Sequence, residues 1–160
     1  MTPQREWALL LILAGIQFTH ILDFMIMMPL GPQLMRVFGI NPTEFGLLVA
    51  SYGLAAGLTG FLGGFFVDRF DRRRTLLTLY IGFTIATLAS AIAPTFGLLL
   101  LARFTAGAFG GIANSVLSAM VGDAVPPARL GRAMSTVMTA SPLASIVGVP
   151  AGLIVAGWWG

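Results

Sequence analysis

The stretch GGFFVDRFDRRRTLL, residues 63–77, places four arginines and two aspartates between two long apolar runs. The run before it extends from Phe45 to Val67, and the run after it from Thr75 to Ala93. A helix needs roughly 20 apolar residues to cross the ~30 Å hydrocarbon core of a bilayer. We therefore expect the charged stretch to be a short turn in water that joins two membrane-spanning helices.

Three further apolar runs lie on either side of this pair, from Trp7 to Met28, from Phe96 to Val121 and from Ala133 to Gly157. The runs are continuous and rich in Leu, Ala and Gly, without the alternation of an outer-membrane barrel strand. The sequence predicts an all-α fold, a polytopic membrane helix bundle over residues 1–160. Its five spans are expected at about residues 7–28, 45–67, 75–93, 96–121 and 133–157.

The composition excludes several classes of protein. Of the 160 residues, 57% are hydrophobic and only 9% are charged, whereas soluble domains average about 25% charged residues. A soluble enzyme, a nucleic-acid-binding module and a disordered tail are therefore excluded. The absence of cysteine removes disulfides, thiolate metal sites and thiol nucleophiles. No phosphate loop, zinc pair, triad or paired-carboxylate site is present, so we predict no enzyme, no metal and no cofactor.

The first apolar run has two interpretations. Because Arg5 precedes it, the run resembles a cleavable signal peptide. Its length, the embedded His20 and Asp23, and the lack of a small-residue cleavage site favour a retained span instead.

The arginines predict the orientation of the bundle. On one side lie Arg5, Arg69, Arg72, Arg73, Arg74, Arg129 and Arg132, and on the other side only Arg36 lies in a loop. Because cytoplasmic loops carry the excess of basic residues, the N-terminus is expected in the cytoplasm. All basic residues are arginine, which fits a bacterial protein, so the expected location is a bacterial inner membrane.

Polar side chains inside the first span form one stripe, because Gln17, His20 and Asp23 are spaced by three residues. A carboxylate in hydrocarbon costs at least about 2.5 kcal/mol, and such residues usually mark a pathway. Asp23 is therefore either a group on a transport pathway or half of a structural ion pair. His20 either shares that role or is a hydrogen-bonded residue inside the bundle.

Arg103 is the basic residue inside the fourth run, and its depth from the outer end matches that of Asp23. We predict that the two charges neutralise one another and that proton binding to Asp23 competes with this pairing. Such competition is one way to couple a proton to a conformational change.

Small residues predict close helix packing in three spans. They recur mostly every fourth residue, a spacing that lets helix backbones approach. The second span has Gly53, Gly57, Gly60 and Gly64, the fourth has Gly107, Gly111 and Ser115, and the fifth has Gly148 and Gly152. Pro142 and Pro150 also predict that the fifth helix is kinked.

The charged turn resembles the loop signature G-x-x-x-D-R-x-G-R-R/K of the major facilitator superfamily. The matching residues are Gly64, Asp68, Arg69, Arg72 and Arg73, and Asp71 stands where the family usually has glycine. The resemblance implies that this loop helps to hold a cytoplasmic gate. A helix N-terminus attracts a carboxylate, which gives Asp68 a physical reason for that role.

Other segments carry the same resemblance. Residues 20–34, HILDFMIMMPLGPQL, resemble the first helix of proton antiporters of this family, and Arg103 with Gly107 matches its fourth-helix motif R-x-x-x-G. Gly148, Pro150 and Gly152 partly match the antiporter motif of the fifth helix. Residues 122–135 resemble the family's P-x-x-R-G-x-A linker. The resemblance implies that Asp23 is the proton-linked carboxylate and Arg103 its partner.

The family fold has twelve helices in two halves, so residues 1–160 correspond to the first five helices of the N-terminal half and read as a fragment. The resemblance implies a secondary transporter that exports a drug-like or sugar-like compound in exchange for protons. The expected partners are this substrate, protons, the lipid bilayer and the missing second half or a partner chain, with no nucleic acid. Two alternatives remain: a truncated, non-transporting protein that docks on a transporter, and a nutrient uniporter or symporter.

Overall fold

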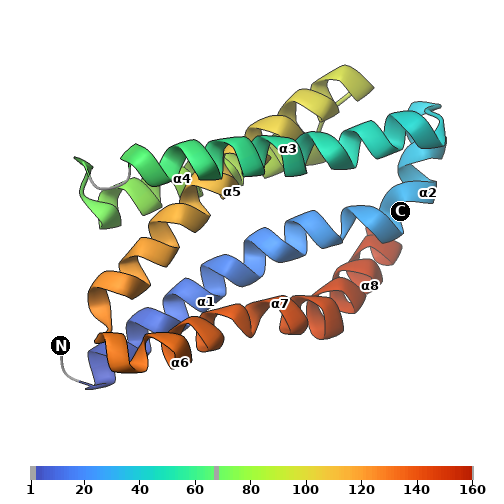
Figure 1. Ribbon diagram of the computed structural model, residues 1–160. Coiled ribbons are helices and arrows are strands. Elements are labelled where there is room, and N and C mark those ends of the chain that lie inside the picture. Colours follow the sequence, from blue (N-terminus) through green and yellow to red (C-terminus); the bar gives the residue numbers. More distant parts are fainter. Residues whose placement is uncertain (1–2, 67–68, 160) are drawn as a thin grey trace. The chain divides into compact units, whose positions relative to one another are not determined.

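The structure is a computed structural model that describes residues 3–66 and 69–159, and its helices are shown in Figure 1. They are α1 (Pro3–Met25), α2 (Met27–Phe38), α3 (Pro42–Phe66), α4 (Arg72–Ala91), α5 (Phe96–Ala124), α6 (Pro127–Met138), α7 (Ala140–Leu143), a π-helical turn η2 (Ala144–Gly148) and α8 (Val149–Trp159). Within the described residues the regular structure is helical throughout. The prediction of an all-α membrane bundle is confirmed.

Five segments of the described residues are long and apolar enough to cross a membrane: Gln4–Met25, Pro42–Phe65, Arg72–Ala91, Phe96–Ala124 and Pro127–Val155. Apolar side chains lie exposed along them, such as Leu58, Phe61 and Ile85, as expected of helices in contact with lipid. The fourth segment is the most enclosed, with 44% of its apolar window buried against 17 to 22% for the others. This segment is the long helix α5.

The chain forms two compact units, and α5 contributes to both. The first unit contains the residues up to Ile26 and those from Leu117 onward. In it, α1 lies along α6, α7 and η2 (Figure 1). The two segments run in the same direction, because Glu6 near the start of α1 pairs with Arg129 near the start of α6, and Ile26 just after α1 meets Gly152 of the following helix α8.

The second unit contains residues 27–116. Here α3 and the first part of α5 run parallel, since Tyr52 meets Gly107 and Gly60 meets Gly111 further along both helices. The intervening α4 runs the other way, as a short turn joins it to α5. Near that turn Leu48 and Leu99 are buried with Met27, and Phe45 packs on this cluster.

The helical structure continues beyond the first apolar run. A span ending at about Met28 stays a prediction, and after a break at Ile26 the chain continues as α2 to Phe38. Two prolines suggested the earlier end. Pro29 is tolerated because it lies in the first turn, where backbone N–H groups have no intrahelical partner, and Pro32 lies inside the helix.

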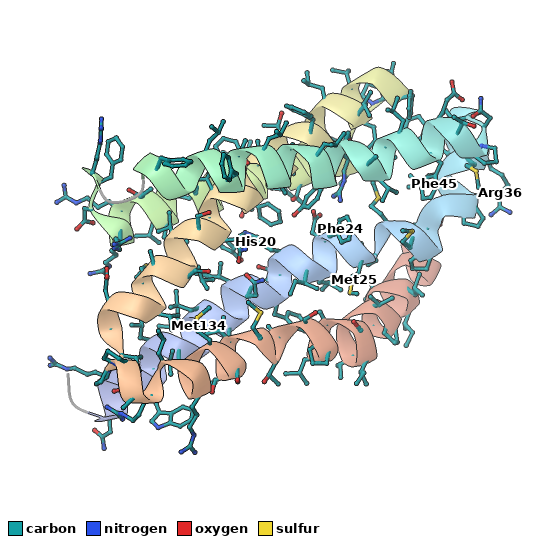
Figure 2. All side chains as sticks on the ribbon, viewed as in Figure 1. His20, Phe24, Met25, Arg36, Phe45 and Met134 are labelled. Carbon is teal, nitrogen blue, oxygen red and sulfur yellow. The ribbon has the colours of Figure 1, made fainter. Side chains whose placement is uncertain are left out.

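The chain reverses between α2 and α3 through a glycine and a reciprocal cap. Gly39 has φ 62°, the left-handed conformation that ends many helices. The Asn41 side chain then accepts the N–H of Glu44 at 2.9 Å, and the Glu44 carboxylate accepts the N–H of Asn41 at 2.8 Å. This capping box begins α3. Figure 2 shows Phe45 at this end of α3, where its ring covers Gly31 of α2.

Candidate functional site

Arg103 is a buried residue of α5 that belongs to the second unit. Its residue is only 3% exposed, and its guanidinium carbon lies 4.6 Å from the centre of the Tyr52 ring, on α3. An aromatic face attracts a cation by ~2 kcal/mol or more where water is excluded. Tyr52 is therefore part of the environment of Arg103. Sequence reasoning missed it, although a tyrosine within a long apolar run was the available signal.

The position of Tyr52 depends on the glycine that follows Arg103 by one helical turn. A Cβ built on Gly107 would overlap the carbonyl oxygen of Tyr52 and lie 2.9 Å from its Cα. One turn further, a Cβ on Gly111 would overlap the carbonyl oxygen of Ala56. The glycines thus allow the two backbones to touch, which sets Tyr52 beneath the guanidinium.

Two hydrogen bonds cross the same contact. The hydroxyl of Ser115 donates to the carbonyl of Gly60 at 2.7 Å, and that of Thr59 lies 2.9 Å from the carbonyl of Ala108. The predicted close packing is found at some of the small residues of α3 and not at others. A Cβ on Gly60 would meet Gly111, whereas a Cβ on Gly53, Gly57 or Gly64 would meet nothing within 4 Å among the described residues.

The polar stripe of α1 belongs to the first unit. His20, labelled in Figure 2, is buried, and Asp23 and Gln17 are half-buried. Arg103 belongs to the second unit. The pairing of Asp23 with Arg103 therefore stays a prediction.

The arginine turn leads directly into α4. Asp68, the predicted gate carboxylate, lies outside the described residues. Arg69 is exposed, and Arg72 and Arg73 form the first two residues of the helix. Gly64 is exposed near the end of α3.

Asp71 stands where the family usually has glycine, and it caps α4. Its carboxylate accepts the N–H of Arg74 at 2.8 Å, which is the bond expected of an aspartate N-cap. Its φ of −61° and ψ of 112° are extended backbone that any residue adopts. The turn therefore needs no glycine here.

The last span packs on α1 through its glycines. A Cβ on Gly148 would lie 2.9 Å from Leu22 Cδ1 and 3.0 Å from Phe18 Cζ, and one on Gly152 would overlap Ile26. The hydroxyl of Ser145 lies 3.2 Å from the sulfur of Met25, and Figure 2 shows Met25 on the side of α1 toward η2.

The same span changes its helical winding before Pro150. Proline removes an N–H from the helix and its ring crowds the carbonyl four residues earlier. Here the residues before it, Ala144–Gly148, form a π-helical turn, and the N–H of Val149 reaches the carbonyl of Ala144. Such turns occur often at functional sites.

An apolar groove of about 550 Å³ lies between α4 and α5 in the second unit. Gly82, Ile85, Leu98 and Leu101 line it, and its lining, among the described residues, includes no charged side chain.

These observations identify the general class of protein. Five apolar segments, a buried arginine and backbones in contact at glycines describe an integral membrane helix bundle. The chain belongs to the Major Facilitator Superfamily, whose sequence profile it matches over residues 13–160. This confirms the family that the motifs predicted. It is a family of transporters, so the prediction that the chain is not an enzyme is also confirmed.

Curated relatives include an antibiotic resistance protein and a drug efflux pump. The puromycin resistance protein pur8 of Streptomyces alboniger is 32% identical over 151 residues, which cover 94% of this chain and 30% of the relative. A chloramphenicol efflux pump of Mycobacterium tuberculosis is 28% identical over 125 residues, or 78% of this chain and 30% of the pump. The chain thus spans 22 to 33% of the length of these curated relatives and of others that it matches.

Solved structures show the same fold. A bacterial homolog of the human lysosomal transporter Spinster, in an inward-facing and unoccupied conformation, superposes with a TM-score of 0.83. The two sequences are 20% identical, and the match covers 90% of this chain and 30% of the other. At this level of identity the likeness shows the fold alone.

Proposed function

We propose that the chain is part of a secondary transporter that exports a small drug-like or sugar-like compound in exchange for protons. Asp23 binds the proton, Arg103 is its counter-charge, and His20 lies on the same stripe. Efflux is favoured because relatives that match most of this chain are named for resistance to puromycin and efflux of chloramphenicol. The proposed location of this transporter is a bacterial inner membrane, with the N-terminus in the cytoplasm.

The observation that carries this proposal is the burial of Arg103. An arginine inside a membrane helix is costly, so it is kept where it pairs with another group or lines a pathway. The ring of Tyr52 offsets part of this cost. We assign the negative charge that balances Arg103 to a carboxylate that is ionised in one conformation and protonated in another, and Asp23 is the carboxylate within the first span.

The proposed orientation is supported by the contact between Glu6 and Arg129 at 3.2 Å. This contact puts the beginnings of α1 and α6 at one end of the first unit. Both beginnings carry arginines, as the cytoplasmic orientation requires. Asp68 with Arg69, Arg72 and Arg73 forms the proposed cytoplasmic gate, and Gly148, Pro150 and Gly152 make up the proposed antiporter segment.

The test uses the full-length protein in cells, with puromycin and chloramphenicol as probes. Asp23→Asn keeps the size of the side chain but removes proton binding. We expect the variant to lose efflux driven by the proton gradient while its amount in the membrane stays unchanged. The matched control is Glu44→Gln, which removes a carboxylate from the capping box while a glutamine still caps the helix. Efflux that is equal in Asp23→Asn and Glu44→Gln would reject the coupling role.

Collapse of the proton gradient separates the remaining mechanisms. Antiport predicts that a protonophore abolishes efflux from the unaltered protein, whereas uniport predicts that it has no effect. Symport of a nutrient predicts accumulation inside the cell instead. If the chain occurs by itself at 160 residues, copurification with a transporter and no flux of its own would favour a docking role.

A further inference from the structure

A small cavity lies where α1 and α6 begin, within the first unit. Its volume is about 80 Å³. Its lining combines both charges and apolar side chains, and includes Glu6, Trp7, Leu10, Arg129, Arg132 and Ala133. Sites for drug-sized ligands enclose about 300–1,000 Å³, so this cavity is too small for a transported compound. It has room for a compact polar group.

The charges in the cavity leave a positive excess. Glu6 and Arg129 pair at 3.2 Å, and the Glu6 side chain is only 13% exposed while that of Arg129 is 57% exposed. The pair neutralises itself and holds Arg129 against α1. Arg132 lines the cavity from the same face of α6, is exposed and is not part of that pair. One positive charge is thus left to attract an anion.

The helix that carries both arginines adds to the attraction. Pro126 precedes the first turn of α6 and makes no side-chain cap, so the positive end of the helix dipole is not covered by a capping oxygen. The cavity floor is apolar, because Leu10 and Ala133 are buried. Trp7 lies at its rim and is 49% exposed. Indole rings favour the headgroup level of a bilayer.

We propose that this cavity binds the phosphate of an anionic bilayer lipid. Arg132 binds the phosphate, Glu6 positions Arg129 beside it, and Trp7 packs against the glycerol and the first acyl carbons. A lipid fits better than a soluble anion because the site lies at the ends of two apolar spans and joins a basic rim to an apolar floor. Basic pockets between membrane helices bind acidic headgroups in this way. Lipid binding is measured without transport, so the inference stands or falls independently of the proposed function.

The experiment measures thermal unfolding of the purified full-length protein in detergent during titration with phosphatidylglycerol or phosphatidylcholine of the same acyl chains. We expect phosphatidylglycerol to stabilise at lower concentration. Arg132→Gln should weaken this binding about fivefold, since one arginine near an anionic surface contributes ~1 kcal/mol. Arg129→Gln should weaken binding at least as much, because it leaves the Glu6 carboxylate in the cavity without its partner, and it provides a second test if Arg132→Gln does not fold.

The matched control is Arg36→Gln, which removes one exposed arginine from the end of α2. We expect it to leave the preference for phosphatidylglycerol unchanged. A loss equal to that of Arg132→Gln would mean that overall charge, rather than this cavity, attracts the lipid. Equal stabilisation by the two lipids would also overturn the proposal. Inorganic phosphate is the third titrant, and if it stabilises as well as phosphatidylglycerol the site takes free phosphate instead.

Discussion

The contact between α3 and α5 differs from the contact between α1 and the last span. In the first, Gly107 and Gly111 bring backbone against backbone, and the hydroxyl of Ser115 bonds across to a carbonyl. In the second, Gly148 faces the ends of the Leu22 and Phe18 side chains, and the crossing polar contact reaches a sulfur. Backbone atoms cannot move aside as side-chain ends can. The α3–α5 pair is thus built to keep one geometry, and the last span to tolerate adjustment.

The largest effect is expected for Gly107→Ala. The added methyl would overlap the Tyr52 backbone, and overpacking of this kind costs about 1–3 kcal/mol. We expect a loss of about 2 kcal/mol in unfolding free energy, measured in detergent on the full-length protein. Gly53→Ala is the control, because its methyl meets nothing within 4 Å among the described residues. It should be neutral or slightly stabilising, and an equal loss in both variants would refute a special contact at Gly107.

A smaller effect is expected for Gly148→Ala. Its methyl meets only Leu22 and Phe18 side-chain ends, which rotate away. Alanine also favours a helix over glycine by about 0.5–1 kcal/mol. The same unfolding measurement should therefore give a loss below that of Gly107→Ala, by about 1 kcal/mol or more. If Gly148→Ala is the more damaging variant, the difference between the two contacts is the reverse of the one described.

The smallest effects are expected at the two serines. Ser115→Ala removes the bond to the Gly60 carbonyl, and hydrogen bonds between membrane helices average about 0.6 kcal/mol. Ser145→Ala removes a contact to the Met25 sulfur, which is a weak acceptor. Unfolding should show a measurable loss for Ser115→Ala and none for Ser145→Ala. A loss at Ser145 alone would contradict the comparison.

Hydropathy predicted the long apolar helices because a helix that crosses the bilayer needs roughly 20 apolar residues in a row. It gave no reason to extend the helix beyond Met28, since Pro29 and Pro32 are ordinary stop signals. The α2 helix continues because its first turn needs no N–H from Pro29 and because Phe45 packs over Gly31. Contacts of this kind form between segments distant in sequence, and local patterns do not reveal them.

The candidate site was predicted in part. Arg103 was identified from its charge within an apolar run, and the structure places it in a buried position. Tyr52 was not identified, because hydropathy along the sequence does not reveal which side of a helix faces which neighbouring helix. Asp71 was noted only as a departure from the family pattern, although an aspartate before a helix is a recognised cap signal. The roles of Asp23, His20 and the gate residues remain predictions.

The π-helical turn at Ala144–Gly148 affects how the chain tolerates changes in length. Such a turn holds one residue more than the α-helical winding around it. Deleting one residue from it would leave a regular helix, and Gly152 would still face α1. In α5, deleting one residue before Gly111 would turn every later residue by about 100° around the helix axis. Gly111 would then no longer contact the α3 backbone. We therefore expect relatives to differ in the number of residues at the position of η2. The number of residues between Arg103 and Ser115 should be the same in all of them.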